Sequence, residues 1–382
     1  MNELISFSIV LFTVIMVVWL DRIKNPAVNK LLEWIPAILF AYIIPAVITH
    51  LFHLDLSAVQ LHQVSKVFIM PLAIVLVMSA LSFAQLKAVG IRPIAVFVSG
   101  SFAVAILPIV LLLLLNTFTN VFHFEIIEKE YWQGLVTIVG SWIGGSTSQL
   151  VLKELVECPE SIFLIILVMD NVMVNIWTIL MFQFIKRSEW FNKVFNIEDK
   201  PVDFIPNEVN ISSKTLKSVY KVTAICLVLV VLSVFLIKSF LLKILLLSFA
   251  GLILGNTLKF WSHAFVIKLG GYLIITIMAI LGLKLNFSDF SVPGYVILFA
   301  AIWLILHYVV MMVVAYLLKL NMAWVPICSM ANVGGISTAP AVTKSYNEEW
   351  MPHAILLAIL SMVSGTYWGI LTIFLFKTLF LS

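Results

Sequence analysis

Residues 140–149 read GSWIGGSTSQ, which places three glycines, four hydroxyl side chains and one amide inside an apolar stretch of the chain. Residues 331–342 show a related pattern, ANVGGISTAPAV. Paired glycines permit a tight bend and a positive φ angle, and such a bend interrupts a helix. Irregular backbone at membrane depth is tolerated only where protein buries it or where it lines a wet cavity. These two segments therefore decide how the rest of the chain is interpreted.

The composition indicates a membrane protein. Of the 382 residues, 62% are hydrophobic and only 11% are charged, about half the charged fraction of a typical soluble domain. Apolar runs long enough to span a bilayer fall at 4–20, 31–52, 66–84, 93–115, 161–184, 219–237, 244–258, 265–285, 293–318 and 354–380. The net charge of +4 gives no indication of nucleic-acid binding.

The chain divides into two similar halves. The two glycine segments interrupt further apolar stretches at 133–153 and 323–343, and one long polar interval lies between them at 186–217. The predicted fold is an all-α membrane protein with a first repeat at 1–185, a linker at 186–217 and a second repeat at 218–382. Each repeat is expected to contain about five transmembrane helices plus one broken or re-entrant helix.

The distribution of positive charge predicts the topology. If the broken stretches are re-entrant hairpins, most of the 23 Lys and Arg residues lie on the side of the linker, which the positive-inside rule makes cytoplasmic. Both termini then lie outside. Five crossings per half turn the second half upside down, and IGGST at 143–147 matches VGGIS at 333–337. Inverted repeats with broken helices near their centre are typical of transporters. Fully crossing broken helices are the alternative.

The glycine segments supply the predicted binding residues. Free N–H groups at the start of a half-helix and nearby hydroxyls or amides suit a polar or anionic solute. Pro340 is expected to prevent a regular helix from continuing through the second segment. No Arg or Lys lies deep in a span beside these segments, so neutral and zwitterionic solutes stay open. The predicted solute or ion contacts are Gly144, Gly145, Ser146, Thr147, Ser148, Gln149, Asn332, Gly334, Gly335, Ser337 and Thr338.

A coupling site is predicted in the span that follows the first glycine segment. Asp170 lies near the centre of FLIILVMDNVMVNIW, where burial of a carboxylate costs at least about 2.5–3.5 kcal/mol. With Asn171 and Asn175 it suits Na⁺ or H⁺ coupling; an interhelical hydrogen bond is the alternative. His307, inside LILHYVVMM, is expected to be a packed, hydrogen-bonded residue.

Other functions are less consistent with the sequence. A membrane aspartyl protease needs two deep aspartates, and no HExxH, CxxC or P-loop pattern occurs. The protein is therefore predicted not to be an enzyme and to need no metal or cofactor except Na⁺ as a coupling ion. A channel or uniporter is the main alternative, because broken helices also line channels. The expected partners are a small solute and the lipid bilayer, with a homodimer left open.

Four blocks carry a resemblance to a known family. They are GSWIGGSTSQLVLKE at 140–154, VMDNVMVNIW at 168–177, ANVGGISTAPAVTKSYN at 331–347 and SGTYWGI at 364–370. In this order they resemble the DUF819, or YjcL-like, family of bacterial membrane proteins. The pattern is also similar to inverted-repeat symporters for 2-hydroxycarboxylates and for glutamate. The resemblance implies a Na⁺- or H⁺-coupled carrier of an organic anion or amino-acid-like solute in the bacterial cytoplasmic membrane.

Overall fold

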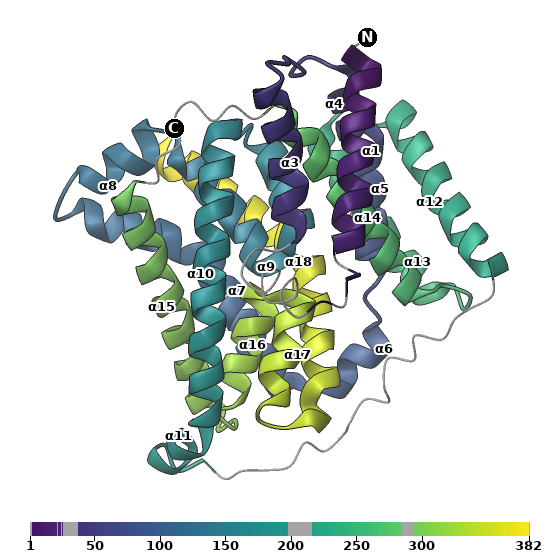
Figure 1. Cartoon of the computed structure of the whole chain (residues 1–382). Helices are drawn as coiled ribbons and strands as arrows, with labels where there is room; N and C mark the ends of the chain where they lie inside the picture. The colour runs from purple at the N-terminus through teal and green to yellow at the C-terminus, as the bar shows by residue number, and fades with distance from the viewer. Residues whose placement is uncertain are drawn as a thin grey trace. The chain divides into compact units, whose positions relative to one another are not determined.

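The computed structural model describes residues 2–20, 22–23, 25, 37–197, 216–284 and 293–381. Over this part the chain is helical and contains no strand (Figure 1). Ten of the described helices are long and apolar enough to cross a membrane. The predicted all-α membrane fold is confirmed.

The surface of several helices is apolar, as a lipid solvent requires. In α1 (Asn2–Leu20) the side chains of Phe7, Phe12 and Ile15 are all more than half exposed. In α12 (Leu216–Leu236) only 22% of the residues in its most apolar stretch are buried. Water would penalise such surfaces, whereas a bilayer would not.

The chain forms two compact units, and each unit combines helices from both halves of the sequence. Unit 1 contains α1, α3 (Ala37–Leu51), α4 (Gln60–Val64), η1 (Ser65–Ile69), α5 (Met70–Met78), α12, α13 (Phe240–Thr257) and α14 (His263–Gly282). Unit 2 contains α6 (Phe83–Leu86), η2 (Lys87–Val89), α7 (Ile91–Asn116), α8 (Val121–His123), η3 (Phe124–Glu128), α9 (Tyr131–Leu155), α11 (Ser188–Val194), α15 (Gly294–Leu317), α16 (Trp324–Val333), α17 (Gly335–Lys344), η4 (Glu348–Trp350) and α18 (Met351–Phe380). The long helix α10 (Glu160–Lys186) contributes its first part to unit 1 and its second part to unit 2.

Unit 1 is built around α14 and α5. Helix α14 packs on α3 and α5, and α13 packs on α5. Gly251 and Gly255 of α13 lie against the backbone carbonyls of Val75 and Ser79, so two helices approach closely where any side chain would collide. Small residues four apart are a common means of packing membrane helices.

Unit 2 is built around α18, which packs on α7, α9, α16 and α17. Helix α15 packs on α7 and α16. The rings of Trp142 in α9 and Trp303 in α15 lie against each other with centroids 4.5 Å apart and planes tilted by 46°, so these two helices are also in contact. Both glycine segments therefore belong to one unit, although they are half the sequence apart.

Where residues are described, the predicted spans agree with the observed helices within a few residues, with two informative differences; residues 31–36 of the span predicted at 31–52 lie outside the described residues. The span predicted at 66–84 starts earlier, at Gln60, and ends at Met78, because it joins α4, a π-helical turn and α5. The short run at 244–258 becomes a full helix from Phe240, where the Ser239 hydroxyl caps the backbone N–H of Leu242 at 3.4 Å. Ser is a favoured helix N-cap.

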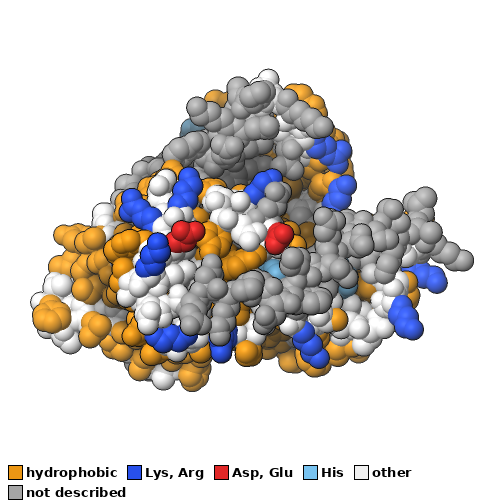
Figure 2. Space-filling view, turned by 90° about the horizontal axis from the view of Figure 1, so that it is seen from below, with side chains coloured by type: hydrophobic (Ala, Val, Ile, Leu, Met, Phe, Trp, Pro, Cys, Tyr) orange, Lys and Arg blue, Asp and Glu red, His pale blue; other side chains and the backbone are white. Residues whose placement is uncertain are grey.

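The predicted linker is only partly described, because residues 198–215 lie outside the described residues. Its first part forms α11, whose Asn192 is buried and bonds to Asn321 and Met322 of unit 2. The predicted domain boundaries stay a prediction. Lys and Arg side chains are much more common than acidic ones on the face shown in Figure 2. The side of the membrane on which the linker lies also stays a prediction.

Candidate functional site

The first glycine segment forms the tip of a helical hairpin. Within α9, Gly145 has φ 65° and ψ −165°, a conformation open essentially only to glycine. The chain then folds back, so that a Cβ on Gly140 would lie 2.8 Å from the backbone nitrogen of Gln149. At the base of the hairpin the Gln133 side chain donates to the carbonyl of Val156 at 2.9 Å. Although α9 is long enough to span a membrane, its two halves lie side by side.

The second glycine segment forms a second hairpin, made of α16 and α17. Gly335 has φ 70° at the tip. At the base, the Asn321 amide donates to the Tyr346 hydroxyl at 3.0 Å, and the rings of Trp324 and Trp350 stack at 4.9 Å. Both broken segments are therefore folded back on themselves, as predicted for re-entrant hairpins. The inverted orientation of the two halves stays a prediction.

The prediction for Pro340 was wrong. Helix α17 continues through Pro340, and the break lies at Gly334 and Gly335 instead. Proline removes only one hydrogen bond of α17, the one to the carbonyl of Ile336. That carbonyl lies next to the tip and lacks its usual helical donor.

The two glycines of each pair have different roles. The first glycine lacks a positive φ and is crowded: Gly144 borders Ser148, and Gly334 borders Thr338, four residues further on in each case. The second glycine has a positive φ and open space where a Cβ would be, at Gly145 and at Gly335. This match, position by position, supports the predicted duplication.

Both tips meet at the middle of α18. The Ser361 hydroxyl lies within hydrogen-bonding distance of the Ile143 carbonyl, next to the first tip, and 3.2 Å from Oδ1 of Asn332, next to the second. One hydroxyl has a single proton to donate, so it can serve only one of these oxygens at a time. Gly365 packs against Gly144, where a Cβ on Gly144 would lie 3.0 Å from the Cα of Gly365.

Asn332, a predicted solute contact, is occupied by protein partners. It is 2% exposed, its Oδ1 accepts from Ser101 at 2.8 Å, and its Nδ2 donates to the Phe97 carbonyl at 3.2 Å. With Ser361 it joins α7, α16 and α18. Ser148 is similarly bonded by Thr366 of α18 at 3.0 Å. These two residues hold the tips in place.

Three other predicted contacts keep polar atoms without a partner among the described residues. They are the hydroxyl of Thr147, Nε2 of Gln149 and the hydroxyl of Thr338. Thr147 is 7% exposed and Gln149 is 2% exposed. Ser146 is half-buried, and the side chain of Ser337 lies outside the described residues. Buried polar groups are nearly always hydrogen-bonded in native proteins, so these atoms indicate a place for a solute or water.

The predicted coupling residues are divided between the two units. Asp170 is 4% exposed and belongs, with Asn171, to unit 1. Asn175, one turn beyond Asn171, belongs to unit 2. Their role in coupling stays a prediction.

Lys153 was missed by the sequence analysis. It lies eight residues beyond Gly145 in the second half of α9, it is 4% exposed, and its ammonium is 3.5 Å from the carboxylate of Glu154. The sequence analysis expected no Lys or Arg to lie deep beside the glycine segments, and the burial of Lys153 corrects that expectation for the first segment. The structure thus adds one buried cation to the hairpin that carries the first tip.

A family comparison covers both hairpins. Residues 8–379 match the family model described as "Protein of unknown function (DUF819)". The chain belongs to the DUF819 family. The match extends over nearly the whole DUF819 chain and includes both tips and α18. No curated protein matches the sequence.

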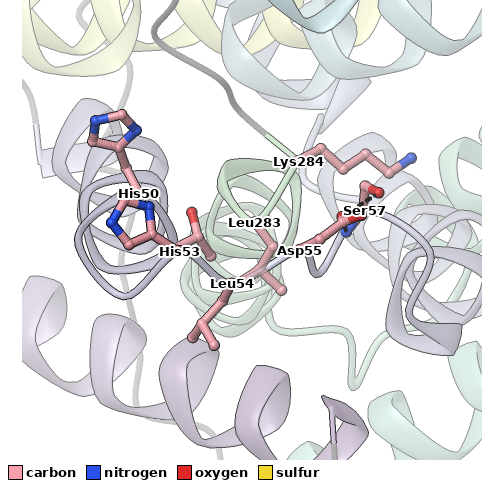
Figure 3. A pocket seen from close by; sticks show the side chains of 8 residues that line it. His50, His53, Leu54, Asp55, Ser57, Leu283 and Lys284 are labelled. Atoms are coloured by element: carbon pink, nitrogen blue, oxygen red, sulfur yellow. Dashed lines mark hydrogen bonds between the residues drawn. The ribbon is translucent and has the colours of Figure 1, made fainter.

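A polar pocket in unit 1 of this DUF819 protein is a weaker candidate. It holds about 500 Å³ and is lined by residues at the ends of α3 and α14 and in the loop after α3, among them His50, His53, Asp55 and Lys284. The Ser57 hydroxyl and backbone N–H hold the pKa of Asp55 below its usual value. Figure 3 shows the two imidazoles at one end and Lys284 with Asp55 at the other, separated by Leu54. The charged groups do not converge, and no described group of three or more His, Cys, Asp or Glu side chains could hold a metal ion.

Proposed function

We propose that this DUF819 protein is a secondary active transporter of a small organic solute, either an organic anion or an amino-acid-like compound, coupled to Na⁺ or H⁺. The observation that carries the proposal is the meeting of two hairpin tips at Ser361. These tips retain buried polar atoms that have no partner among the described residues. Broken helices at membrane depth are typical of solute sites in transporters.

The tips have the chemistry of a binding site. After Gly145 and after Gly335 a half-helix begins, and its first N–H groups have no intrahelical partner. These N–H groups and the hydroxyls of Thr147 and Thr338 favour a solute rich in acceptor oxygens. Hydroxyl and amide groups bind solutes but do not serve as acid or base near neutral pH. We therefore infer a carrier rather than an enzyme.

The hydrogen bonds of Ser361 give a physical basis for two states. Its single proton can bond to the carbonyl at the first tip or to Asn332 at the second. A solute that replaces one of these bonds would shift the balance between the two arrangements, because a ligand shifts an equilibrium by its differential affinity for the two states. We assign the coupling ion to Asp170, a buried carboxylate within a span.

Two matched variants of one helix test the proposal. Thr147 and Thr137 are both buried in α9, but the Thr137 hydroxyl donates to the Gly134 carbonyl at 2.8 Å, whereas the Thr147 hydroxyl has no partner among the described residues. Purified protein in proteoliposomes would be given radiolabelled acetate, lactate, alanine or glutamate, with a Na⁺ gradient, a proton gradient or neither. We expect gradient-dependent accumulation of at least one solute. Thr147→Val should lower this uptake about tenfold without loss of thermal stability, and Thr137→Val should lower stability without loss of uptake.

The same assay separates the alternatives. Fast movement of solute or ions that stops at equal concentrations, and that depends on neither gradient, would indicate a channel instead of a carrier. Asp170→Asn should abolish gradient-driven accumulation. Full accumulation in that variant would remove Asp170 from coupling and leave the role of the tips intact.

A further inference from the structure

His307 lacks the hydrogen bonds expected of a packed histidine. It lies in the middle of α15, its side chain is fully buried, and neither Nδ1 nor Nε2 has a partner among the described residues. Trp303, one turn earlier, is also fully buried, and its Nε1 has no described partner. A neutral imidazole carries one donor and one acceptor, and an indole carries one donor. Three polar atoms on one face of α15 are therefore buried with no partner in the described part of the chain, which is rare in native proteins.

This face of α15 lies beside both hairpins of unit 2. Trp303, His307 and Met311 are spaced four residues apart and are all fully buried, so they share one face. The ring of Trp303 lies against that of Trp142, tilted by 46°, and Trp142 precedes the first tip by less than one turn. Met311 lies on Gly100 of α7, where a Cβ would be 2.6 Å from its sulfur and 2.9 Å from the amide nitrogen of Asn332. His307 is thus placed between contacts to the first hairpin and contacts to the second.

We propose that Trp303 and His307 form part of the solute site and bind a small carboxylate that carries a neighbouring hydroxyl or ammonium group. This proposal rests on the proposed carrier function. The indole N–H and the imidazole N–H donate to the carboxylate oxygens, and the second imidazole nitrogen accepts from the hydroxyl or ammonium group. Residues four apart on a helix have Cβ atoms about 5–6 Å apart, a spacing that a group of this size can bridge.

The hydrogen-bonding groups of Trp303 and His307 predict which of the two side chains distinguishes between solutes. Trp303 has only a donor, so it contributes equally to any carboxylate. His307 has an acceptor as well, so it distinguishes lactate and alanine from acetate, which has no second polar group. A buried site that hydrogen-bonds a hydroxyl or amine of its solute rejects analogues without that group, because the polar atom of the site is then left unpaired.

The test measures binding and uptake separately in three variants of the full chain. Trp303→Phe removes the N–H and keeps a ring against Trp142; His307→Leu removes both nitrogens; His307→Gln keeps one donor and one acceptor. Thermal stability would be followed in detergent with increasing acetate, lactate or alanine, and uptake in proteoliposomes with the same three probes. Because the removed atoms have no described partner, we expect all variants to fold with unchanged or higher stability.

The expected pattern is specific. Lactate or alanine should stabilise the wild type at concentrations at least about tenfold lower than acetate requires. His307→Leu should remove this preference, and His307→Gln should retain part of it. Trp303→Phe should lower the affinity for all three probes by about tenfold. Wild-type probe affinities and KM values in His307→Leu and Trp303→Phe would overturn the site and leave the carrier function standing. Binding lost in these variants, without gradient-driven uptake by the wild type, would keep the site and overturn the carrier function.

Discussion

The two hairpins of unit 2 have the same tip but different bases. At both tips a crowded glycine precedes a glycine with positive φ and open space. In the first hairpin the Gln133 side chain donates to the Val156 carbonyl at the base, and the two halves touch between base and tip, where Gly140 lies against the backbone of Gln149. The second closes through side chains, with Trp324 stacked on Trp350. The two hairpins therefore share the geometry of the tip, whereas the contacts that hold their two halves together differ.

The largest effect is expected where the two halves of the first hairpin touch, at Gly140 and Gln149. Gly140→Ala would place a Cβ 2.8 Å from the nitrogen and 2.9 Å from the Cα of Gln149, and the backbone of the second half of α9 would have to move. We expect a loss of about 3 kcal/mol in the free energy of unfolding. Chemical unfolding in detergent measures this loss.

Gly271 in α14 provides the matched control for that substitution. It lies within a helix and has nothing within 4 Å of a Cβ. Gly271→Ala should therefore be neutral or stabilise the protein by up to about 1 kcal/mol. Equal losses in the two variants would contradict the close approach of the two halves of α9.

The sequence predicted the hairpins but not their contents. Paired glycines mark a bend locally, and the distribution of Lys and Arg over the loops favoured folded-back helices over crossing ones, which stayed the alternative. The roles within each pair were not predictable, since Gly144 is crowded by Gly365, 221 residues away. Asn332 looked like a solute ligand for the same reason: its partners Ser101 and Phe97 come from the other half of the chain.

His307 differs from its prediction in its hydrogen bonds. A lone histidine in an apolar helix is usually hydrogen-bonded, so the sequence favoured a structural role. Only the structure shows that both ring nitrogens are buried without a described partner. The burial of Lys153 was likewise visible only in the structure, where this side chain is 4% exposed.

An intermediate effect is expected at the tips. Gly145→Ala and Gly335→Ala meet no atom, yet each forces a side chain into a positive φ. Each should cost about 2 kcal/mol, and uptake should fall at least about tenfold because relaxation of the strain moves the half-helix starts. The two variants should behave alike. Thermal stability and proteoliposome uptake check this, and a strong loss in only one of them would break the equivalence of the tips.

The smallest effect is expected at the base of the second hairpin. Tyr346→Phe removes the acceptor of the Asn321 amide, which lies 3.0 Å away. A hydrogen bond of this kind contributes about 1 kcal/mol. The oxygen of Asn321 keeps its bonds from Asn192 and from the backbone of Ala323, and the stack of Trp324 on Trp350 still closes the base.

Tyr346→Phe should therefore lower the free energy of unfolding by about 1 kcal/mol and leave uptake at the wild-type rate. Hydrogen exchange of residues 335–344 should be unchanged, since helix α17 keeps its contacts with α18. If uptake fell together with faster exchange at the Gly335 end of α17, the base would control the tip. The two hairpins would then differ in mechanism as well as in construction, because the first has no hydroxyl at the equivalent place: its base is closed by the Gln133 amide on the Val156 carbonyl.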